Sequence, residues 1–386
     1  MSMAKIKEVK AGKVDVAGLR KALNSTLKGA VYDLREENPT DVKEWIPTGA
    51  TWLDGIIAKG RMGGIPVGKI IEIAGIQATG KSYLAAQIAG NAQKQGIIPV
   101  YFDAESAINS EFLTKAGCDL ENLIYIQPPD LESVFETMEA LMGSSEDRFL
   151  FIIDSLAATP TKVDTEGTFN PNERIGVKAA LLAKAFQKVT TPMAQHGSTL
   201  IMLNQLKVNI KATSEAPMNG KYLTDSQKYG TPGGSSPDFF TSVRIWLTKS
   251  FAKDSMVYDA KGYQIGSHVR ARIEKSRFGT QNRIAEFKIL WGDQVGVMNE
   301  ESILEAIKGK TEHLETGTWN KLTYADGTVE KWQGLEEGFV DLMKTNEKFR
   351  NRVMEIFDYE VIQKFDKKLG DAKDFLNDGK GEDVQH

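Results

Sequence analysis

The sequence predicts an α/β protein with a mostly parallel central sheet flanked by helices. Short β-rich apolar runs alternate with segments whose apolar residues recur at helical spacing, which is the pattern of parallel strands joined by helical crossovers. The chain has 386 residues, of which 41% are hydrophobic and 26% charged, so it can bury a sizeable core. This composition excludes a small stapled scaffold and wholesale disorder.

The expected elements follow in chain order. The parallel strands are expected at five apolar runs: Ile70–Ala74, Pro99–Phe102, Leu123–Gln127, Phe149–Ile153 and Thr199–Leu203. The crossover helices are expected between them: Lys81–Lys94, Leu131–Met142 and Glu173–Gln195. Later runs lie close together and alternate, so we expect an antiparallel extension of the sheet: Val243–Thr248, Val269–Glu274 and Ala285–Leu290.

The chain divides into four expected parts, which are residues 1–46, 47–295, 296–365 and 366–386. The first is an N-terminal segment with one short amphipathic helix at Val16–Leu23, expected to serve polymerisation because such a helix has no core of its own. The second is the core domain. The third carries helical patterns around a hairpin signal at Asp326-Gly327 and forms a small α/β domain, and the last is a flexible charged tail.

Composition also limits the location and the metal chemistry of the protein. No apolar run approaches the roughly 18 residues that span a bilayer, and the N-terminus has no apolar stretch for export, so we expect a cytoplasmic protein without a membrane partner. Cys118 is the single cysteine and the four histidines lack metal-ligand spacing, so no metal centre is expected beyond an ion carried by a ligand. The net charge of −4 leaves room for a local basic surface.

One motif carries specific chemistry. The pattern GxxxxGK[ST] of a phosphate loop is formed by Gly75, Ile76, Gln77, Ala78, Thr79, Gly80, Lys81 and Ser82. It follows an expected strand and opens an expected helix, where backbone N–H groups and the helix dipole favour phosphate oxygens. We expect Lys81 to reach the β and γ phosphates of a nucleotide and Ser82 to hold Mg²⁺.

Acidic residues follow two neighbouring strands. Asp154 ends the run Phe149–Ile153 and is the expected partner of Mg²⁺, directly or through water. Hydrolysis also needs a group that aligns the attacking water, and we assign this role to Glu105, with Asp103 as the competing candidate.

The order of eight motifs resembles bacterial RecA recombinases and their phage relatives of the UvsX type: GIQATGKS, YFDAESAIN, LIYIQPPDLES, FIIDSLAATPT, TLIMLNQ, TPGGSS, SVRIWL and IEKSRFG. The resemblance covers roughly residues 46–295. It implies a P-loop NTPase with a RecA-like core that uses ATP and Mg²⁺, polymerises on single-stranded DNA and exchanges strands with homologous double-stranded DNA. Single-strand-binding and loader proteins are further expected partners, in the bacterial nucleoid or a phage-infected host.

The resemblance also implies roles for individual residues of the nucleotide site. Phe112 falls where the family has a tyrosine stacked on adenine, and Tyr83 directly follows the phosphate loop. Gln205 matches a glutamine that senses the γ-phosphate and passes the nucleotide state to a DNA loop. Lys275 and Arg277 match a basic pair that reaches the nucleotide of the neighbouring subunit, so hydrolysis would require a polymer.

Two segments correspond to the DNA loops of the family, at about residues 164–176 and 206–233. The second carries a local excess of lysine, which suits phosphate contacts in an otherwise acidic chain. The expected DNA-binding residues are Arg174, Ile175, Lys178, Lys207, Ile210, Lys211, Gly233 and Gly234. The chain departs from the family at Ala180 and Gln187, where arginines are usual, and Arg174, Lys178 and Lys184 lie close enough to replace them.

Two other classes of protein share some of these features. A ring-forming motor such as a hexameric DNA helicase also combines a phosphate loop with basic residues supplied by a neighbour, but it usually carries a large helical domain before the core. A regulatory ATP-binding filament or recombination mediator would have weak turnover, against which an intact Glu105 counts. Residues 1–46 hold no such large domain, and the Lys275 and Arg277 pair together with two candidate DNA loops fits a filament former better.

Overall fold

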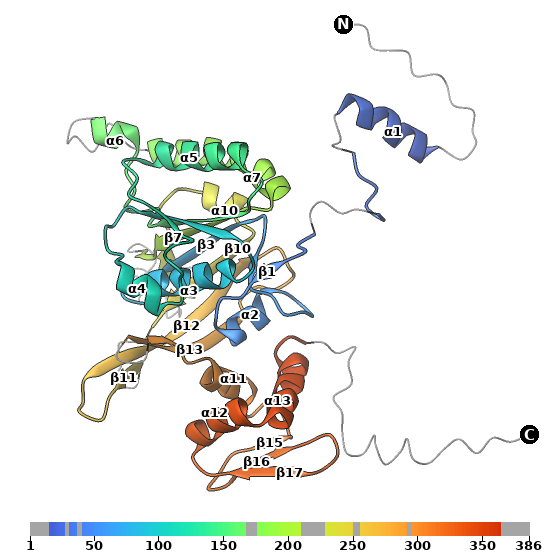
Figure 1. Cartoon of the computed structure of the whole chain (residues 1–386), viewed down its shortest axis with the longest axis vertical. Coiled ribbons are helices and arrows are strands. Elements are labelled where there is room, and N and C mark those ends of the chain that lie inside the picture. The colour runs from blue at the N-terminus through green and yellow to red at the C-terminus, as the bar shows by residue number, and fades with distance from the viewer. Residues whose placement is uncertain are drawn as a thin grey trace, which may run out of the picture. The chain divides into compact units, whose positions relative to one another are not determined.

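The computed structural model describes residues 15–27, 31–36, 41–166, 176–209, 228–249, 255–291 and 295–363. The chain divides into two compact units, of which the first ends at Lys43 and the second begins at Glu44. The second unit is an α/β fold with helices on both faces of a large sheet (Figure 1). This confirms the predicted fold class. None of the described helices is long and apolar enough to cross a membrane.

The first unit contains helix α1 (Val16–Thr26), which begins where the sequence predicts. The Asp15 side chain caps it by accepting from the N–H of Gly18 at 2.9 Å. No residue of the helix is buried, and its apolar side chains are about half exposed at Val16, Leu19 and Leu23. The helix therefore presents an apolar stripe at i, i+3 and i+7 that its own unit leaves uncovered.

The described residues form a ten-stranded central sheet. Its order is β14 (Val295–Val297), β13 (Ile284–Trp291), β12 (Gln264–Ser276), β10 (Val243–Thr248), β3 (Ile70–Gly75), β7 (Thr199–Gln205), β6 (Phe149–Asp154), β4 (Ile98–Asp103) and β5 (Ile124–Ile126), with β11 (Met256–Tyr258) paired to β12. From β10 to β5 every pairing is parallel, and from β12 to β14 it is antiparallel.

The prediction for Val243–Thr248 is wrong in direction. β10 pairs in parallel with β3, with Val243 opposite Ile71, and in antiparallel fashion with β12. The connection after β7 carries helix α10 (Ser236–Phe240), which packs on the helical layer, so β10 enters the sheet from the same end as β3. A crossover of this length permits a parallel strand, and the antiparallel extension begins one strand later than expected.

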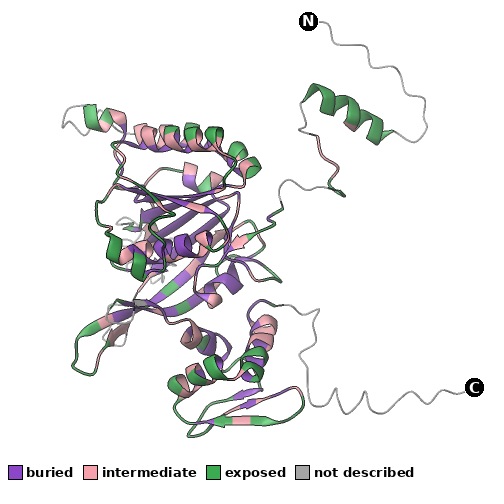
Figure 2. Cartoon of the chain, viewed as in Figure 1, coloured by how far each residue is buried: buried purple, intermediate pink, exposed green. Residues whose placement is uncertain are grey.

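Successive side chains of each strand point to opposite faces of the sheet, so they pack into two separate hydrophobic cores. Ile71 and Ile73 of β3 face helix α3 (Lys81–Gln93), whereas Ile70 faces helices α5 (Leu131–Ser144) and α7 (Val177–His196) on the other side. Figure 2 shows the strands of the sheet mostly buried, and the exposed residues of α5 and α7 on their outer side. Because parallel strands are covered on both faces, they read as continuous apolar runs in the sequence.

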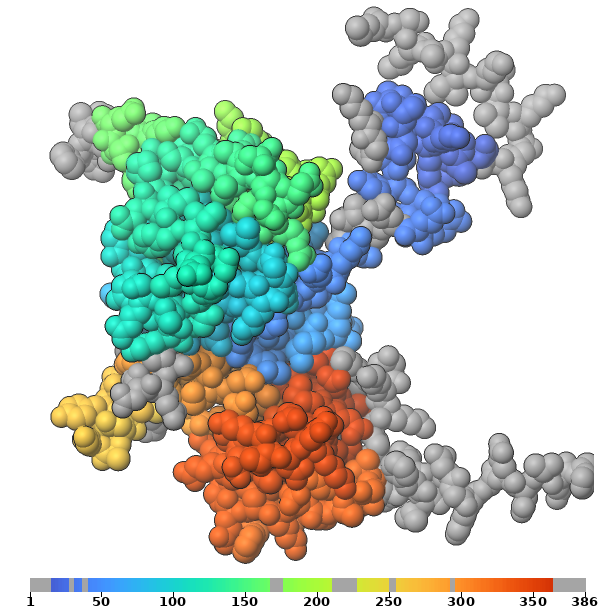
Figure 3. All heavy atoms as spheres, in the orientation of Figure 1, coloured from blue at the N-terminus to red at the C-terminus, as the bar shows by residue number. Residues whose placement is uncertain are grey.

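The first of these cores continues into the C-terminal elements. They are helices α11 (Asn299–Ile307), α12 (Leu335–Thr345) and α13 (Glu347–Glu360) and strands β15 (Leu314–Glu315), β16 (Asn320–Thr323) and β17 (Val329–Trp332), and helix α2 (Thr51–Ile57) from the start of the second unit packs with them. A methyl group on Gly55 of α2 would lie 2.8 Å from the Phe357 ring of α13, so the two helices are in close contact. In the space-filling view these C-terminal elements lie directly against the core (Figure 3).

Shorter elements were not predicted by the periodicity of the sequence. They are β1 (Trp45–Ile46), β2 (Ile65–Pro66), α4 (Ser110–Lys115), α6 (Lys162–Glu166), β8 (Lys207–Val208) and β9 (Tyr229–Gly230). The β1–β2 pair belongs to the second unit, so the boundary between the units falls at residue 43 and not at residue 46. β8 and β9 pair with each other at the two described ends of the segment 206–233.

Asp54 on α2 gives the fold a pH dependence. Its buried carboxylate accepts from the N–H and, at 2.7 Å, from the hydroxyl of Thr48, yet burial raises its pKa from 3.8 to about 7. The folded state then binds a proton that the unfolded state releases, so stability falls as pH rises from about 4 to 7, by roughly 2–4 kcal/mol. Asp54→Asn is expected to flatten this dependence and to raise the urea midpoint at pH 8.

Equilibrium urea unfolding between pH 5 and pH 8 measures this effect. Asp341→Asn, an exposed acid on α12, is the matched control and should keep the wild-type profile. An Asp54→Asn profile that falls as steeply as that of the wild type would contradict the assignment.

Candidate nucleotide-binding site

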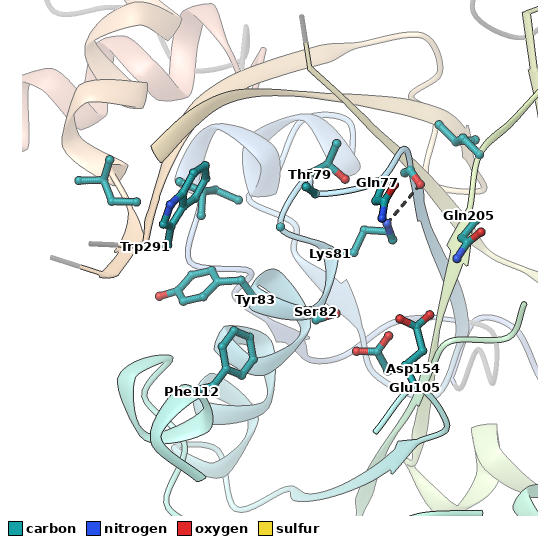
Figure 4. A pocket seen from close by; sticks show the side chains of 16 residues that line it. Gln77, Thr79, Lys81, Ser82, Tyr83, Glu105, Phe112, Asp154, Gln205 and Trp291 are labelled. Atoms are coloured by element: carbon teal, nitrogen blue, oxygen red, sulfur yellow. Dashed lines mark hydrogen bonds between the residues drawn. The ribbon is translucent and has the colours of Figure 1, made fainter. Parts of the chain in front are cut away.

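A cavity of about 720 Å³ opens at the carboxyl ends of β3, β6 and β7. Sixteen residues line it: Gly75, Gln77, Ala78, Thr79, Gly80, Lys81, Ser82, Tyr83, Glu105, Phe112, Asp154, Gln205, Leu206, Ile289, Leu290 and Trp291. Figure 4 shows the polar side chains gathered at one end and the aromatic rings at the other. The structure thus brings together nearly all of the residues that the sequence assigns to a nucleotide.

The phosphate loop depends on two glycines. Gly80 has a φ of +78°, and a side chain on Gly75 would lie 2.6 Å from the Thr79 hydroxyl oxygen and 2.9 Å from the carbonyl oxygen of Leu247. Thr79 closes the loop by donating to the carbonyl of Ile76 at 2.9 Å. The loop therefore turns tightly into α3, whose N-terminus faces the cavity.

Lys81 lies folded over this loop. Its Nζ donates to the carbonyl oxygens of Gly75 at 3.2 Å and Ile76 at 3.1 Å (Figure 4). Burial lowers the pKa of Lys81, and the charges of Asp154 and Glu105 oppose that shift. A cation held at the floor of the cavity in this way can bind an anion that enters it.

Asp154 is buried at the end of β6, where two nearby hydroxyl groups donate hydrogen bonds to its carboxylate. The Tyr101 hydroxyl donates to its Oδ2 at 2.8 Å, and Ser82 donates to the same carboxylate. Burial raises the pKa of Asp154, and these two hydrogen bonds oppose that increase. A hydroxyl and a carboxylate side by side are hard oxygen donors, so the residues present fit Mg²⁺, which takes few protein ligands and keeps several waters.

The structure separates the two candidate acids of β4. Asp103 is 1% exposed, and its carboxylate accepts from the N–H of Ile108 at 3.0 Å and the hydroxyl of Tyr125 at 2.8 Å, so it holds the following turn in place. Glu105 is exposed and lines the cavity, and its Oε1 accepts from the Ser155 hydroxyl at 2.5 Å. Glu105 is therefore the acid of this pair that faces the cavity.

An aromatic group forms the other end of the cavity. The rings of Tyr83 and Phe112 meet edge to face with centroids 6.0 Å apart, and the half-exposed Trp291 extends from the end of β13 toward them (Figure 4). The sequence analysis missed Trp291 together with Ile289 and Leu290. The sequence feature that could have indicated it is a tryptophan directly after the apolar run Ala285–Leu290.

A buried ion pair is connected to Gln205 through hydrogen bonds, and the sequence analysis did not predict it. Glu72 of β3 is 0% exposed, and its carboxylate accepts from Nε of Arg244 at 2.5 Å and from the side-chain amide of Asn204 at 2.8 Å. The Asn204 carbonyl in turn accepts from the N–H of Gln205 at 3.0 Å, and Arg244 donates to the Thr231 hydroxyl at 3.0 Å. The network joins Gln205 to the end of the segment 206–233.

The basic pair Lys275 and Arg277 does not line the cavity of its own chain. Lys275 donates to the carbonyl oxygen of Asp238, and Arg277 donates to that of Phe239 at 2.8 Å, both in α10. Burial and the charges of Arg277 and Arg244 lower the pKa of Lys275. Phe239 itself is 75% exposed, so this corner of the molecule presents two cations and an aromatic ring to its surroundings.

Seven of the eight candidate DNA residues fall into three groups, and Lys178 is the eighth. Arg174, Ile175, Ile210 and Lys211 lie outside the described residues. Lys207 is exposed on β8. Gly233 and Gly234 have φ values of +113° and +71°, and a side chain on Gly234 would lie 2.9 Å from Cβ of Ala179, so packing against α7 also requires glycine there.

Lys178 departs from its predicted role. Its ammonium donates to the carbonyl oxygens of Leu156, Ala157 and Thr159 within the chain, and it is not free to contact a DNA phosphate in this structure. The sequence could not reveal this, because the turn that supplies the carbonyls lies some twenty residues earlier and is brought to α7 by the fold.

The fold and the cavity define a nucleoside triphosphate-binding protein of the P-loop class. The family model described as the RecA N-terminal domain matches residues 15–296. Protein RecA of Corynebacterium efficiens is 32% identical over 347 residues, which are 90% of this chain and 80% of that protein. Protein RecA of Aquifex aeolicus is 31% identical over 312 residues, which are 80% of this chain and 82% of that protein. The chain belongs to the RecA family, as its motifs indicated.

Proposed function

We propose that this chain is a DNA-dependent ATPase that polymerises on single-stranded DNA and catalyses homologous pairing and strand exchange. One observation carries the proposal beyond the family membership. Gln205 lines the nucleotide cavity, and β8 of the segment 206–233, which carries the candidate DNA lysines, begins two residues later at Lys207. A change at the γ-phosphate can therefore reach the DNA segment through the adjacent residues that join β7 to β8.

The cavity suits ATP in one orientation. Backbone N–H groups of the phosphate loop and Lys81 would hold the phosphates, and the aromatic end formed by Tyr83, Phe112 and Trp291 would hold the adenine ring. Ser82 and Asp154 would hold Mg²⁺ beside the phosphates. The ion, when bound, neutralises charge on the phosphate oxygens.

Hydrolysis needs a positioned water and a stabilised transition state. Glu105 faces the cavity from β4 and can accept a hydrogen bond from the attacking water. Lys275 and Arg277 lie outside their own cavity, so they would act on the nucleotide of a neighbouring subunit by stabilising charge that develops on the phosphoryl group. Turnover is then a property of the polymer, since the complete site needs residues from two subunits.

The proposed filament has a candidate joint in α1. Its uncovered apolar stripe at Val16, Leu19 and Leu23 would be removed from water if the helix packed on the core of the next subunit, and this burial would stabilise the contact. The N-terminal segment up to Lys43 would thus serve polymerisation, with residues 44–295 as the ATPase core, residues 296–365 as a small C-terminal part and residues 366–386 as a tail.

DNA would be bound mainly through its phosphates. Lys207 is exposed at the start of the second loop, and Arg174 and Lys211 would add further cations, with Ile175 and Ile210 between bases. The relatives reported above are bacterial, whereas the altered first loop with Ala180 and Gln187 in the helix after it, and the weakly acidic tail, favour a phage protein of the UvsX type. Either host places the chain in a cytoplasm or nucleoid, with single-strand-binding and loader proteins as partners.

Electron microscopy with circular single-stranded DNA tests the proposal. Helical filaments that form with DNA and a slowly hydrolysed ATP analogue, and not without them, are the expected result. Closed rings would favour a helicase-like motor, which the comparisons do not favour, and filaments without measurable turnover would favour a regulatory filament. Naked DNA would mean that the DNA-loop assignments are wrong.

The hydroxyl of Tyr101 gives a test of the metal site. It holds one oxygen of Asp154 and so leaves the other for Mg²⁺. Tyr101→Phe is expected to weaken Mg²⁺-dependent binding of a fluorescent ATP analogue by about tenfold, because a hydrogen bond to a charged group contributes about 1.5–3 kcal/mol. Tyr125→Phe removes a matching hydroxyl from Asp103 at 2.8 Å and is the control. Equal Mg²⁺ midpoints in the two variants would refute this role for Tyr101.

A further inference from the structure

Lys178 connects the end of the first loop to the turn that follows β6. It lies in the first turn of α7, which begins at Val177 directly after that loop. Its Nζ donates to the carbonyl oxygens of Thr159 at 2.6 Å, Leu156 at 3.3 Å and Ala157 at 3.4 Å. An ammonium has three N–H donors, so all three are used within the chain.

The turn held by Lys178 is itself closed and ordered. The N–H and hydroxyl of Thr159 donate to the carbonyl of Ser155 at 3.0 and 2.9 Å. The N–H of Leu156 donates to the carbonyl of Leu203 in β7 at 2.8 Å. Residues 155–159 therefore form one hydrogen-bonded turn that is anchored to β7 and to Lys178.

Ser155, the first residue of this turn, holds Glu105. Its hydroxyl donates to Oε1 of Glu105 at 2.5 Å, a short bond that occupies one oxygen of the carboxylate proposed to align water. The path from the first loop to Glu105 thus has two polar contacts: the Lys178 ammonium on the turn, and the Ser155 hydroxyl on the carboxylate.

The surroundings of Lys178 join both DNA segments at this point. Lys207 at the start of the second loop is close enough for its charge to lower the pKa of Lys178, after burial, which is the larger cause. The hydroxyl of Ser236, after the end of the second loop, donates to the carbonyl of Ala179 at 3.4 Å. A displacement of either loop therefore reaches the first turn of α7.

We propose that Lys178 is a positioning residue that couples DNA on the first loop to the orientation of Glu105. DNA bound at the first loop shifts the first turn of α7, Lys178 moves the turn 155–159 with it, and the hydrogen bond from Ser155 to Glu105 changes. This inference rests on the proposed function, because it concerns how DNA would raise ATP turnover. It replaces the direct phosphate contact that the sequence suggested for Lys178.

Two substitutions separate the charge from the side-chain volume. Lys178→Met keeps most of the stem and removes the ammonium, whereas Lys178→Arg keeps donors for the carbonyls. Lys188→Met, on an exposed position of α7 where Lys188 pairs with Glu139 at 2.6 Å, is the matched control. The measurements are ATP turnover of the full chain with and without poly(dT), and poly(dT) affinity across a salt series.

The expected result is a loss of coupling. In Lys178→Met the ratio of turnover with poly(dT) to turnover without it should fall at least tenfold, whereas Lys178→Arg and Lys188→Met should keep a ratio within about threefold of the wild type. The poly(dT) affinity of Lys178→Met and the slope of its logarithm against that of salt should remain those of the wild type, because no phosphate contact is lost.

Three outcomes would overturn the inference. A salt slope flatter by about 0.7 in Lys178→Met would assign Lys178 to a DNA phosphate. An equal fall of both turnover rates, with an unchanged ratio, would assign it a structural role, and a wild-type ratio at wild-type rates would assign it none. All three outcomes are compatible with the proposed function. A wild-type chain that binds poly(dT) without any rise in ATP turnover would instead overturn both the proposed function and the role of Lys178.

Discussion

Lys81→Ala is expected to lower ATP turnover by about two to three orders of magnitude, as the removal of one preorganised charge from a transition state does. The Lys81 ammonium lies at the floor of the cavity on the carbonyls of Gly75 and Ile76, where phosphate oxygens would enter. An alanine leaves the loop amides in place but no cation near the transferred phosphoryl group. Turnover of the purified chain with poly(dT) measures the loss.

The same substitution should leave the fold intact. Burial lowers the pKa of Lys81, which means that the charged side chain is held in an environment less favourable than water when no nucleotide neutralises it. Its removal should therefore keep or slightly raise the thermal midpoint. Lys94→Ala at the end of the same helix, where Lys94 contacts Asn91, is the control for charge. Unchanged turnover in Lys81→Ala would move hydrolysis away from the phosphate loop.

The parts of the site that could be predicted from the sequence are those that local sequence determines. The phosphate loop requires glycine at fixed spacing, and a strand before it and a helix after it are visible as apolar periodicity. Asp154 directly follows one apolar run and Glu105 lies shortly after another, and parallel strands bring such ends to one edge of a sheet. These residues were predicted because each depends on a few neighbours in the chain.

The parts that could not be predicted depend on how distant segments meet. Trp291 lines the cavity although β13 and β6 are not neighbours in the sheet, and the direction of β10 depends on the route of a long connection. Asp103 and Glu105 were open alternatives until packing showed which carboxylate was already satisfied. Lys178 had the residue type of a DNA contact, and the three carbonyls that hold it come from another part of the chain.

The Glu72–Arg244 pair illustrates the same limit within the sheet. A glutamate and an arginine stand out in the apolar runs of β3 and β10, yet the sequence does not say that they are partners. Register places them directly opposite each other in neighbouring parallel strands. That register depends on the order of strands, which no local pattern of either run encodes.

Breaking this pair is expected to have the largest effect on stability. Arg244→Met leaves the fully buried carboxylate of Glu72 with the amide of Asn204 and without its cation, and removing one partner of a buried pair costs about 3–5 kcal/mol. The free energy of unfolding in urea should fall by that amount. Because Asn204 also contacts Gln205 and the carbonyl of Pro232 at 2.9 Å, the dependence of poly(dT) affinity on nucleotide should weaken as well.

The double variant Glu72→Met with Arg244→Met decides what the pair contributes. Apolar side chains of similar size remove both desolvated charges, so much of the lost stability should return. Nucleotide-dependent DNA affinity should not return with it, because Asn204 and Thr231 lose the partners that fix them relative to Gln205. Recovery of both properties would mean that the pair has no role in linking the nucleotide to DNA, and recovery of neither would mean that the unpaired charge of Glu72 is not what destabilises Arg244→Met.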